Sequence, residues 1–277
     1  MPKVMKKSRQ VILVTGGEGN LGSQISFGQK LGKDKLDVLD PKSISQAFDY
    51  YKPSVLIHCA VLIDMGICES YPERAFELNV IGTFNVAKAC REKGVKMVYI
   101  SSCSVFKGDK STPYSESDTP EPISVHGQTK RIGEIITSTL NPNSLIVRTG
   151  WLFGNRHTSK GFVNYCIKRL KSHQDIEAGE DRLGSPTYIR DFVEEVKKLI
   201  DEDASGIFHV VNTGCISYFE LAQNIKRMKS FSAEVRPVKV VLVQGNKVKR
   251  GKMEALTSDK ITLRPWQEAL EEYIKTL

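Results

Sequence analysis

Apolar residues along the chain gather in short runs that alternate with segments of helical periodicity. Five runs are almost continuously apolar, as expected of strands buried on both faces: Val11–Thr15, Val55–His58, Val95–Ile100, Leu145–Arg148 and Ile207–Val211. The periodicity of the other segments predicts helices over Ser43–Tyr51, Pro72–Lys93, Gly127–Leu140, Ile189–Asp201, Tyr218–Lys229 and Pro265–Leu277. This alternation predicts an α/β fold, a doubly wound parallel sheet with helices on both faces.

The composition is typical of a soluble globular protein. The chain has 277 residues, of which 40% are apolar and 26% are charged, and a chain of this length can bury a large core. Its longest apolar runs have about six residues, whereas a membrane span needs roughly 20. The apolar stretch Val11–Val14 after the basic start is too short for a secretion signal. We therefore expect a cytoplasmic protein without a membrane partner.

The residues that most often bind metals show no pattern here. The six cysteines, at positions 59, 68, 90, 103, 166 and 215, have no spacing typical of a metal site. Most of them lie in apolar surroundings, so we expect small core residues in a reducing compartment. His157, His173 and His209 have no ligand spacing either. The sequence therefore predicts no bound metal.

A glycine-rich turn follows the first predicted strand. Gly16, Gly19 and Gly22 have a GxxGxxG spacing, with Asn20 and Leu21 before the last glycine. Glycine allows positive φ and lets backbone N–H groups approach a pyrophosphate, and the N-terminus of the helix expected next would add an anion site. Directly after an apolar strand, this spacing predicts a dinucleotide-binding turn. A glycine turn without a ligand is the alternative.

Two interpretations are open for the segment that would lie against the adenosine. A dinucleotide site of this type expects an acidic or basic residue roughly 20 positions after the turn, at the end of a second strand. Between Gly22 and Asp40 there is room for only a short helix and one strand. Asp37 is a candidate ribose carboxylate. We favour instead that Asp37 and Val38 belong to the next strand, whose end lies against the adenine.

With its further motifs, the sequence resembles the extended short-chain dehydrogenase/reductase family nearly end to end and, within that family, the dTDP-4-dehydrorhamnose reductases. The segments that carry the resemblance are Leu36–Pro41, which is similar to the family's third strand, Lys52–Ala60, Cys68–Glu73, Asn79–Thr83, Ile100–Phe106, Tyr114–Asp118, Arg148–Gly154, Asp181–Thr187 and Gly206–His209. The resemblance implies an NAD(P)-binding Rossmann domain over residues 1–151, whose sheet is joined by residues 206–217. A smaller C-terminal substrate-binding lobe would occupy residues 152–277.

The resemblance also implies NADPH or NADH as the cofactor. Carried over residue by residue, the positions that would bind it are Gly16, Gly19, Asn20, Leu21, Gly22, Asp37, Val38, Cys59, Ala60, Asn79 and Lys130. The family's Asn-Ala-Ala motif is His58-Cys59-Ala60 in this chain. Asn79 is expected to shape the helix beside the active site, and a surface helix residue is the alternative interpretation.

The implied reaction transfers a hydride from the nicotinamide to the 4-keto carbon of a nucleotide-linked 6-deoxy sugar. A hydrogen-bond donor must stabilise the charge that develops on the carbonyl oxygen, and an acid must protonate that oxygen. The family uses a Ser or Thr donor, a Tyr acid and a Lys one helical turn later. Ser102 and Lys130 fill the first and last positions, and the tyrosine position is His126.

Histidine at position 126 leaves three interpretations open. His126 can be a working acid in a variant reductase, the fold can keep its ligands while its chemistry is lost or redirected, or an ordinary enzyme can carry an atypical residue. An imidazole nitrogen lies about two bond lengths closer to the backbone than a tyrosine hydroxyl, and the charge of Lys130 favours the neutral ring. We therefore predict impaired turnover unless a water bridges the gap or the substrate lies deeper.

The resemblance places Ser102, Ser104 and Trp151 beside the sugar. Ser104 stands where the family often has a tyrosine, so one expected sugar contact is lost. For Trp151, an aromatic core residue at the end of a strand is the alternative interpretation.

The formal net charge of +8 is concentrated in one part of the chain. The stretch Lys226–Lys252 holds nine basic residues and one acid, which accounts for the whole surplus. Within it, Arg250 fits an Arg-Pro-x-x-Ser segment of the reductases, with Gly251 and Glu254 in place of the Pro and Ser. A basic surface can bind nucleic acid, but one stretch in the substrate half favours a site for the diphosphate of a nucleotide sugar. A solvated basic loop is the alternative.

Two classes of function fit these residues. The first is an NAD(P)H-dependent reductase whose partner is a nucleotide-sugar substrate and not a nucleic acid. The second is a catalytically impaired regulatory or binding subunit, because the beta subunit of methionine adenosyltransferase resembles the same reductases and acts on a partner enzyme. We favour the enzyme and leave open whether the chain forms a homodimer.

Overall fold

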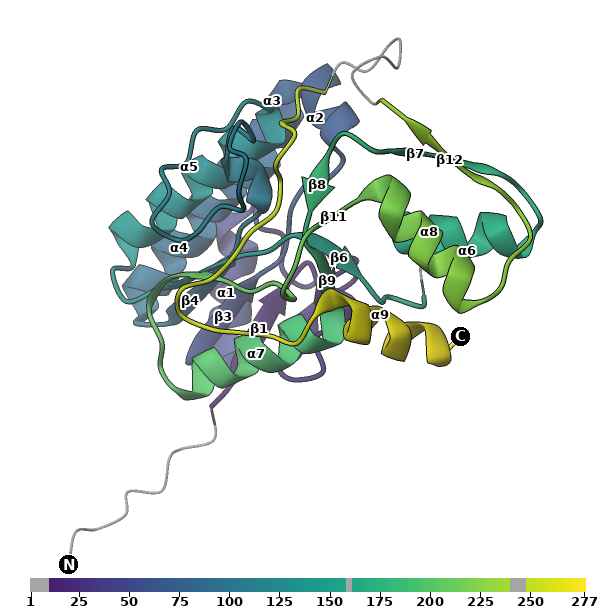
Figure 1. The fold of residues 1–277 in the computed structure, drawn as a ribbon. Helices are drawn as coiled ribbons and strands as arrows, with labels where there is room; N and C mark the ends of the chain where they lie inside the picture. Colours follow the sequence, from purple (N-terminus) through teal and green to yellow (C-terminus); the bar gives the residue numbers. More distant parts are fainter. Residues whose placement is uncertain (1–9, 158–160, 240–247) are drawn as a thin grey trace, which may run out of the picture.

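The computed structural model describes residues 10–157, 161–239 and 248–277, and its centre is a parallel sheet of six strands (Figure 1). Across the sheet the order is β10 (Gly206–His209), β5 (Leu145–Arg148), β4 (Lys96–Ile100), β3 (Val55–His58), β1 (Ile12–Thr15) and β2 (Gln29–Leu31). Five of these strands are the apolar runs of the sequence, and their buried side chains alternate between the two faces. The predicted α/β fold class is confirmed.

Helices cover both faces of the sheet (Figure 1). One face carries α1 (Pro41–Tyr51), α4 (Gly82–Lys93) and α5 (Val125–Leu140), and the other carries α7 (Ile189–Asp201). Helix α7 has the bounds that the apolar periodicity predicted, because one stripe of its side chains, including Phe192 and Val196, is buried against the strands.

A second core lies beside the carboxyl edge of the sheet. Its elements are α6 (Phe162–Lys171), α8 (Tyr218–Met228), α9 (Trp266–Lys275) and the strand pairs β6 (Trp151–Phe153) with β9 (Pro186–Tyr188), β7 (Ile176–Gly179) with β12 (Val235–Val238), and β8 (Leu183–Gly184) with β11 (Ile216–Ser217). Cys166, Ile225 and Leu270 are fully buried between these elements. Helix α8 begins at a capping box in which the side chains of Ser217 and Glu220 each bond the other's backbone N–H.

The two cores do not divide the chain cleanly at residue 151. Strand β10 returns to the sheet beside β5, as predicted. Helix α7 also packs on the sheet, although it lies within the range 152–277 assigned to the substrate lobe. The division into 1–151 with 206–217 and 152–277 stays a proposal, and α7 belongs physically with the sheet.

The segment between β1 and α1 differs from the prediction. The glycine turn leads into η1 (Gly22–Gln24), a single 3₁₀ turn, and not into the helix whose N-terminus was expected to bind an anion. The segment Leu36–Pro41 forms no strand. Polar side chains bond to nearby backbone there, because Asp37 accepts a hydrogen bond from the N–H of Leu39 and Asp40 caps α1.

The predicted helix over residues 72–93 is interrupted. It consists of α3 (Pro72–Phe76), a π-helical turn η2 (Glu77–Ile81) and α4, and it is preceded by α2 (Met65–Ser70). A further 3₁₀ turn, η3 (Cys103–Val105), follows β4. Single π turns inside helices are frequent at functional sites, and this one contains Asn79.

Helix α5 approaches β4 closely because Gly133 has no side chain. A Cβ on Gly133 would lie 2.1 Å from Oη and 2.5 Å from Cζ of the buried Tyr99 ring. We expect Gly133→Ala to lower the free energy of unfolding by about 1–3 kcal/mol through this overlap, measured by urea denaturation. Gly66→Ala in α2 is the control, because the closest atom to its Cβ would be a carboxylate oxygen of Asp64 at 3.3 Å. Equal stabilities of the two variants would contradict the packing argument.

Candidate active site

The glycine turn lies at the carboxyl ends of β1 and β3. Strand β1 has β2 on one side and β3 on the other, so the strand order reverses there, and doubly wound sheets bind ligands at such a crevice. Gly16 has a φ of 63°, and a Cβ on it would lie 2.8 Å from the backbone nitrogen of Ala60. A Cβ on Gly22 would lie 2.2 Å from the carbonyl oxygen of Gly16. The turn therefore requires glycine at both positions.

The same turn offers donors for an anion. Within the described residues, the N–H groups of Asn20 and Leu21 make no hydrogen bond, whereas the N–H of Gly19 donates to the carbonyl oxygen of Gly16. Free N–H groups in such a turn fit the pyrophosphate of a dinucleotide. The amide of Asn155 donates to the backbone and side-chain oxygens of Asn20 at 2.9 and 3.1 Å. Asn155 was not predicted, and its place directly after a family motif was the only sequence signal for it.

A chain of buried hydrogen bonds fastens the turn to β3 and α4. The Oγ1 of Thr15 accepts hydrogen bonds from the N–H groups of residues 59 and 60 and donates to Nδ1 of His58 at 2.9 Å. Because Thr83 Oγ1 donates to the carbonyl oxygen of Asn79, it accepts from Nε2 of His58 at 3.1 Å. Burial lowers the pKa of His58 to about 3, so this ring is neutral and each of its nitrogens has a partner.

Asn79 lies behind the site and not in it. The side chain is 1% exposed. Its oxygen accepts from the N–H of Leu62 at 2.7 Å, and its nitrogen donates to the carbonyl oxygen of Leu62 at 3.1 Å and to Oγ1 of Thr129 at 3.0 Å. Asn79 therefore ties the loop after β3 to α5. Asn79 would therefore influence a bound cofactor only by fixing the position of that loop.

Asp37 and Val38 lie in the turn before α1. One carboxylate oxygen of Asp37 accepts from the N–H of Leu39 at 2.9 Å, and the other lies 3.5 Å from Nζ of Lys33. The side chain is 28% exposed, so one edge of this carboxylate remains open. Val38 is buried, and its carbonyl oxygen accepts from the amide of Asn85. Its side chain thus supports the turn.

Ser102 and Ser104 lie at the carboxyl end of β4. The Oγ of Ser102 accepts from the N–H of Ser104 at 3.1 Å and donates to Oγ of Ser104 at 3.2 Å, so Ser102 caps η3. Both side chains are partly exposed. A ligand oxygen could therefore replace Ser104 as the acceptor for the hydroxyl of Ser102.

His126 lies in the first turn of α5. Gly127 lets this helix begin against η3, because a Cβ on Gly127 would lie 2.1 Å from the carbonyl oxygen of Ser104. His126 is 5% exposed, and its Nδ1 is enclosed without a hydrogen-bond partner. Only Nδ1 is enclosed in this way, so Nε2 is the nitrogen that can reach a ligand. Burial, with smaller effects of the charges of Lys130 and Arg250, lowers the pKa of His126 to about 3.

Lys130 follows one helical turn later and is also buried. Its Nζ lies 4.0 Å from the centroid of the Tyr99 ring. Burial lowers the pKa of Lys130 to about 7, although the carboxylate of Glu134 acts in the opposite direction. Glu134 is itself paired with Arg148 through hydrogen bonds of 2.8 and 2.9 Å. Lys130 therefore gains and loses its proton near neutral pH.

Trp151 and Arg250 meet at the carboxylate of Glu254. The indole of Trp151 stacks on Tyr218 with 3.7 Å between ring centroids, and its Nε1 donates to Glu254 at 2.9 Å. Arg250 donates to both oxygens of Glu254, at 2.7 and 2.5 Å. The structure thus brings together Trp151, which was predicted beside the sugar, and Arg250, which was predicted at the diphosphate. It also pairs Arg250 with an internal acid, which the sequence did not predict.

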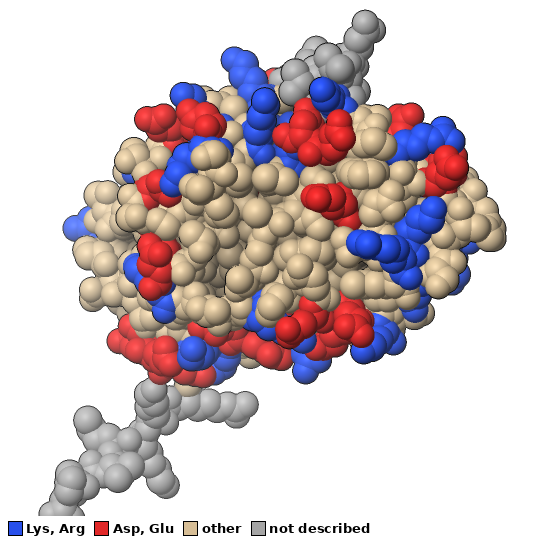
Figure 2. Space-filling model, viewed as in Figure 1, with Lys and Arg blue, Asp and Glu red and all other residues tan. Residues whose placement is uncertain are grey.

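In the described part of the basic stretch Lys226–Lys252, some of the basic side chains pair with acids. Residues 240–247 of it, with Lys247, lie outside the described residues. Arg236 pairs with Asp175 and Glu234. Figure 2 shows Lys and Arg side chains over the region of α8 interleaved with Asp and Glu side chains. At Arg236 the stretch is therefore a solvated surface on which the positive charge is paired with acids.

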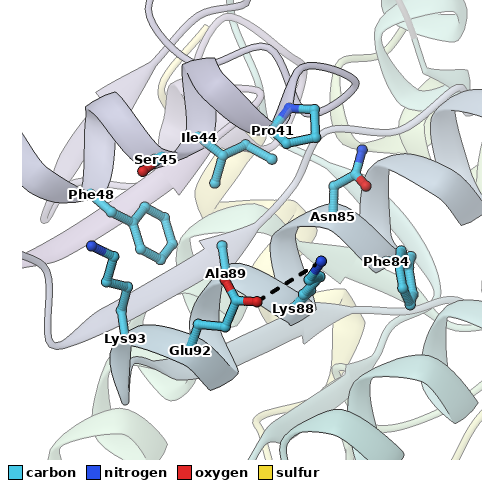
Figure 3. Close-up of a pocket in the computed structure, with 10 residues that line it drawn as sticks. All are labelled: Pro41, Ile44, Ser45, Phe48, Phe84, Asn85, Lys88, Ala89, Glu92 and Lys93. Carbon is cyan, nitrogen blue, oxygen red and sulfur yellow. Dashed lines mark ion pairs between the residues drawn. The ribbon is translucent and has the colours of Figure 1, made fainter.

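A separate pocket lies between α1 and α4 in the outer helical layer (Figure 3). The cavity has a volume of about 140 Å³. Ile44, Phe48 and Phe84 supply its apolar wall, and the ion pair of Lys88 with Glu92, at 3.9 Å, lies at its rim. None of the predicted site residues lines it.

The part of the chain that the structure describes has neither a metal-binding cluster nor a membrane-spanning helix. There, no three His, Cys, Asp or Glu side chains are grouped so that they could hold a metal ion. Within 10–157, 161–239 and 248–277, every helix is too short or too polar to cross a bilayer.

The RmlD substrate binding domain family matches the chain over residues 10–277. The chain belongs to this family. The spore coat polysaccharide biosynthesis protein SpsK of Bacillus subtilis (strain 168) is 32% identical over 278 residues, which cover 95% of this chain and 96% of SpsK. A dTDP-4-keto-6-deoxy-D-glucose reductase of Streptomyces niveus is 29% identical over 247 residues, 86% of this chain and 85% of that enzyme.

Solved structures of a dTDP-4-dehydrorhamnose reductase and of an epimerase have the same fold. The dTDP-4-dehydrorhamnose reductase of Bacillus anthracis, crystallised in complex with NADP, superposes with a TM-score of 0.92 at 31% identity and covers 97% of this chain and 100% of that one. A UDP-glucose 4-epimerase of Thermus thermophilus is similar in fold alone, with a TM-score of 0.81 at 18% identity. The resemblance to the reductases that the sequence motifs indicated is confirmed.

Two buried neutral histidines should make the fold sensitive to acid. His58 and His126, whose ordinary pKa is 6.5, have pKa values of about 3 in the folded chain. Between about pH 6.5 and pH 3, the unfolded chain therefore binds one more proton at each histidine than the folded chain does. The free energy of unfolding falls as the pH decreases below 6.5. The slope is about 1.4 kcal/mol per pH unit for each histidine.

Urea denaturation between pH 5.5 and 4.5, where a histidine is charged in the unfolded chain and neutral in the folded one, measures this slope. We expect His126→Gln to reduce it by about 1.4 kcal/mol per pH unit, because glutamine does not titrate. His173→Gln, at an exposed histidine, controls for the effect of the substitution itself. Identical slopes for wild type and His126→Gln would mean that His126 ionises normally in the folded chain.

Proposed function

We propose that this chain is an NAD(P)H-dependent reductase of the 4-keto group of a nucleotide-linked 6-deoxy sugar, similar to the dTDP-4-dehydrorhamnose reductases. The observation that carries the proposal is the grouping of residues at one edge of the sheet. The glycine turn follows β1, Ser102 follows β4, and His126 and Lys130 lie one turn apart at the start of α5. The reductases named among the relatives support this assignment.

A nicotinamide dinucleotide fits the crevice of this chain. The turn has no side chain at Gly16 or Gly22, and the free N–H groups of Asn20 and Leu21 can bind the pyrophosphate. Lys130 would hold the hydroxyls of the nicotinamide ribose, as the family resemblance implies. When bound, the nicotinamide supplies the hydride.

The residues of the chain must supply the proton. The hydroxyl of Ser102 would donate a hydrogen bond to the sugar oxygen, which stabilises the charge that develops there. His126 is neutral at pH 7 because of its low pKa, so the proton that it can offer is the one on Nε2. A neutral imidazole is a weaker acid than an imidazolium. We therefore propose that His126 is the proton donor of a slow reductase.

The neutral state of His126 also favours a second candidate. Without a charged acid, the chain could bind a dinucleotide or a nucleotide sugar and act as a regulatory subunit, as in the beta subunit of methionine adenosyltransferase. Binding of NADPH with no turnover of any 4-keto sugar nucleotide would support this candidate. Measurable turnover by wild type would support the reductase.

Restoring the tyrosine tests the role of His126. We expect His126→Tyr to raise kcat by at least about tenfold, because a well-placed general acid contributes roughly 10²–10⁴-fold. The assay follows NADPH oxidation with the dTDP-linked 4-keto-6-deoxy sugar. His173→Tyr, at an exposed histidine, is the control and should leave kcat unchanged. An ordinary wild-type rate that the tyrosine does not increase would refute the impairment.

The pH dependence tests Lys130. Its pKa is about 7, so a reaction that needs its charge should lose kcat/KM as the pH rises through 7. Lys130→Arg keeps the charge over this range and should remove the decrease. Lys130→Met should be slow at every pH. A decrease near pH 7 that persists in Lys130→Arg would assign the titration to another group.

A further inference from the structure

A buried carboxylate, Glu254, lies on the substrate side and has no part in the proposed reaction. It stands where the reductase segment has a serine, and its side chain is 8% exposed. Buried carboxylates are rare unless they are paired. The surroundings of Glu254 therefore indicate what it does.

The backbone around Glu254 is held by both parts of the molecule. The N–H groups of residues 252 and 253 donate to the carbonyl oxygen of Gly108, and the N–H of Glu254 donates to the carbonyl oxygen of Leu183. Gly251 packs directly on the backbone, because a Cβ there would lie 2.3 Å from Cα of Gly108. The carboxylate is thus presented at a fixed place.

Glu254 holds Trp151 and Arg250 at the same time. It accepts from Nε1 of Trp151 at 2.9 Å and from Nε and Nη2 of Arg250 at 2.7 and 2.5 Å. The indole is also confined on its faces, by Tyr218 at an interplanar angle of 7° and by Gly184, where a Cβ would lie 2.1 Å from the indole ring. Stacking and a charged hydrogen bond together fix the orientation of Trp151.

The cluster retains one positive charge. Arg182 lies 3.8 Å from Glu254, so two guanidinium groups share one carboxylate. The Nε of Arg182 donates to the carbonyl oxygen of Gly251, and its two terminal nitrogens make no hydrogen bond within the described residues. Met253, the residue before Glu254, packs in one apolar cluster with Cys103, the residue after Ser102, so the cluster lies near the proposed hydrogen-bond donor. An anionic group of a ligand would find free donors here.

We propose that Glu254 is a specificity-determining residue. Because of Glu254, tight binding of a nucleotide ligand requires that the ligand carry a sugar. The inference rests on the proposed function. Glu254 occupies the fork of Arg250, which would otherwise bind the diphosphate of any nucleoside diphosphate. It also fixes the orientation of Trp151, which would contact the sugar of a ligand and not a bare nucleoside diphosphate. Specificity is a difference between two affinities. The occupied fork of Arg250 weakens the binding of both nucleotides, so the preference for the sugar nucleotide comes from the contact of its sugar with the fixed indole of Trp151.

Two substitutions separate the two effects of Glu254. Glu254→Gln keeps an acceptor for Nε1 of Trp151 and removes the charge. It should bind dTDP and dTDP-glucose both about tenfold more tightly, because Arg250 gains a charged hydrogen-bond partner in the ligand. Glu254→Ala also releases Trp151, so its preference for dTDP-glucose over dTDP should fall by about three- to tenfold. Calorimetric titration in the presence of NADP measures each dissociation constant.

Matched variants control for side effects. Trp151→Phe keeps an aromatic ring and loses the N–H, so it should lower the preference for the sugar without tightening dTDP. Glu272→Gln removes a carboxylate that pairs with Arg190 and Arg264 away from the site and should change neither constant. Unaltered NADP affinity in each variant would verify that the fold is intact.

Different outcomes of the titrations would contradict the inference and the proposed function. Unchanged or weaker binding of both ligands by Glu254→Gln would overturn the inference, because Glu254 would then orient Arg250 for the ligand. An unchanged preference in Glu254→Ala would also overturn it. Wild type that binds NADP but neither dTDP nor dTDP-glucose would instead overturn the proposed substrate class.

Discussion

The site depends on the close approach of helix α5 to the carboxyl end of β4. Gly127 and Gly133 leave no side chain between the helix and its neighbours, the carbonyl oxygen of Ser104 and the ring of Tyr99. Because the helix lies so close, the side chains that it presents to the crevice are already buried. Burial lowers the pKa values of His126 and Lys130, so backbone packing sets the protonation states on which any chemistry here depends.

Most charges around the crevice are paired, and the exceptions mark the places for a ligand. Glu134 and Arg148 form a pair in which each side chain is 1% exposed, and such a pair is costly to break although it adds little net stability. Glu254 similarly engages Arg250. The cations left with less compensation are Lys130, beside the proposed cofactor, and Arg182, beside the proposed sugar nucleotide. An anionic or hydroxyl-rich ligand would complete both environments.

The fold was predictable in the segments where buried apolar residues recur with the period of a strand or a helix. Strand β4 and helix α7 bury continuous or amphipathic stretches, so their apolar pattern gave their type and nearly their ends. The prediction failed over residues 22–41, where short polar segments form turns through the side chains of Asp37 and Asp40. It also missed the π turn at residues 77–81. One extra residue shifts the apolar periodicity by about 100°, but the helical segments on either side are too short for the pattern to locate that shift.

The sequence by itself determined the fold class, the family, the glycine turn and the order of Ser102, His126 and Lys130. Each of these depends on patterns or motifs of residues that lie close together along the chain. The sequence indicated that Lys130 favours a neutral His126, but only the tertiary structure showed that burial is the larger cause and that Arg250 is paired with Glu254. The tertiary structure also decided that Glu254 binds Trp151, 103 residues earlier. Ionisation and side-chain pairing depend on the burial and charge that distant segments create around a residue, and local sequence patterns do not carry that information.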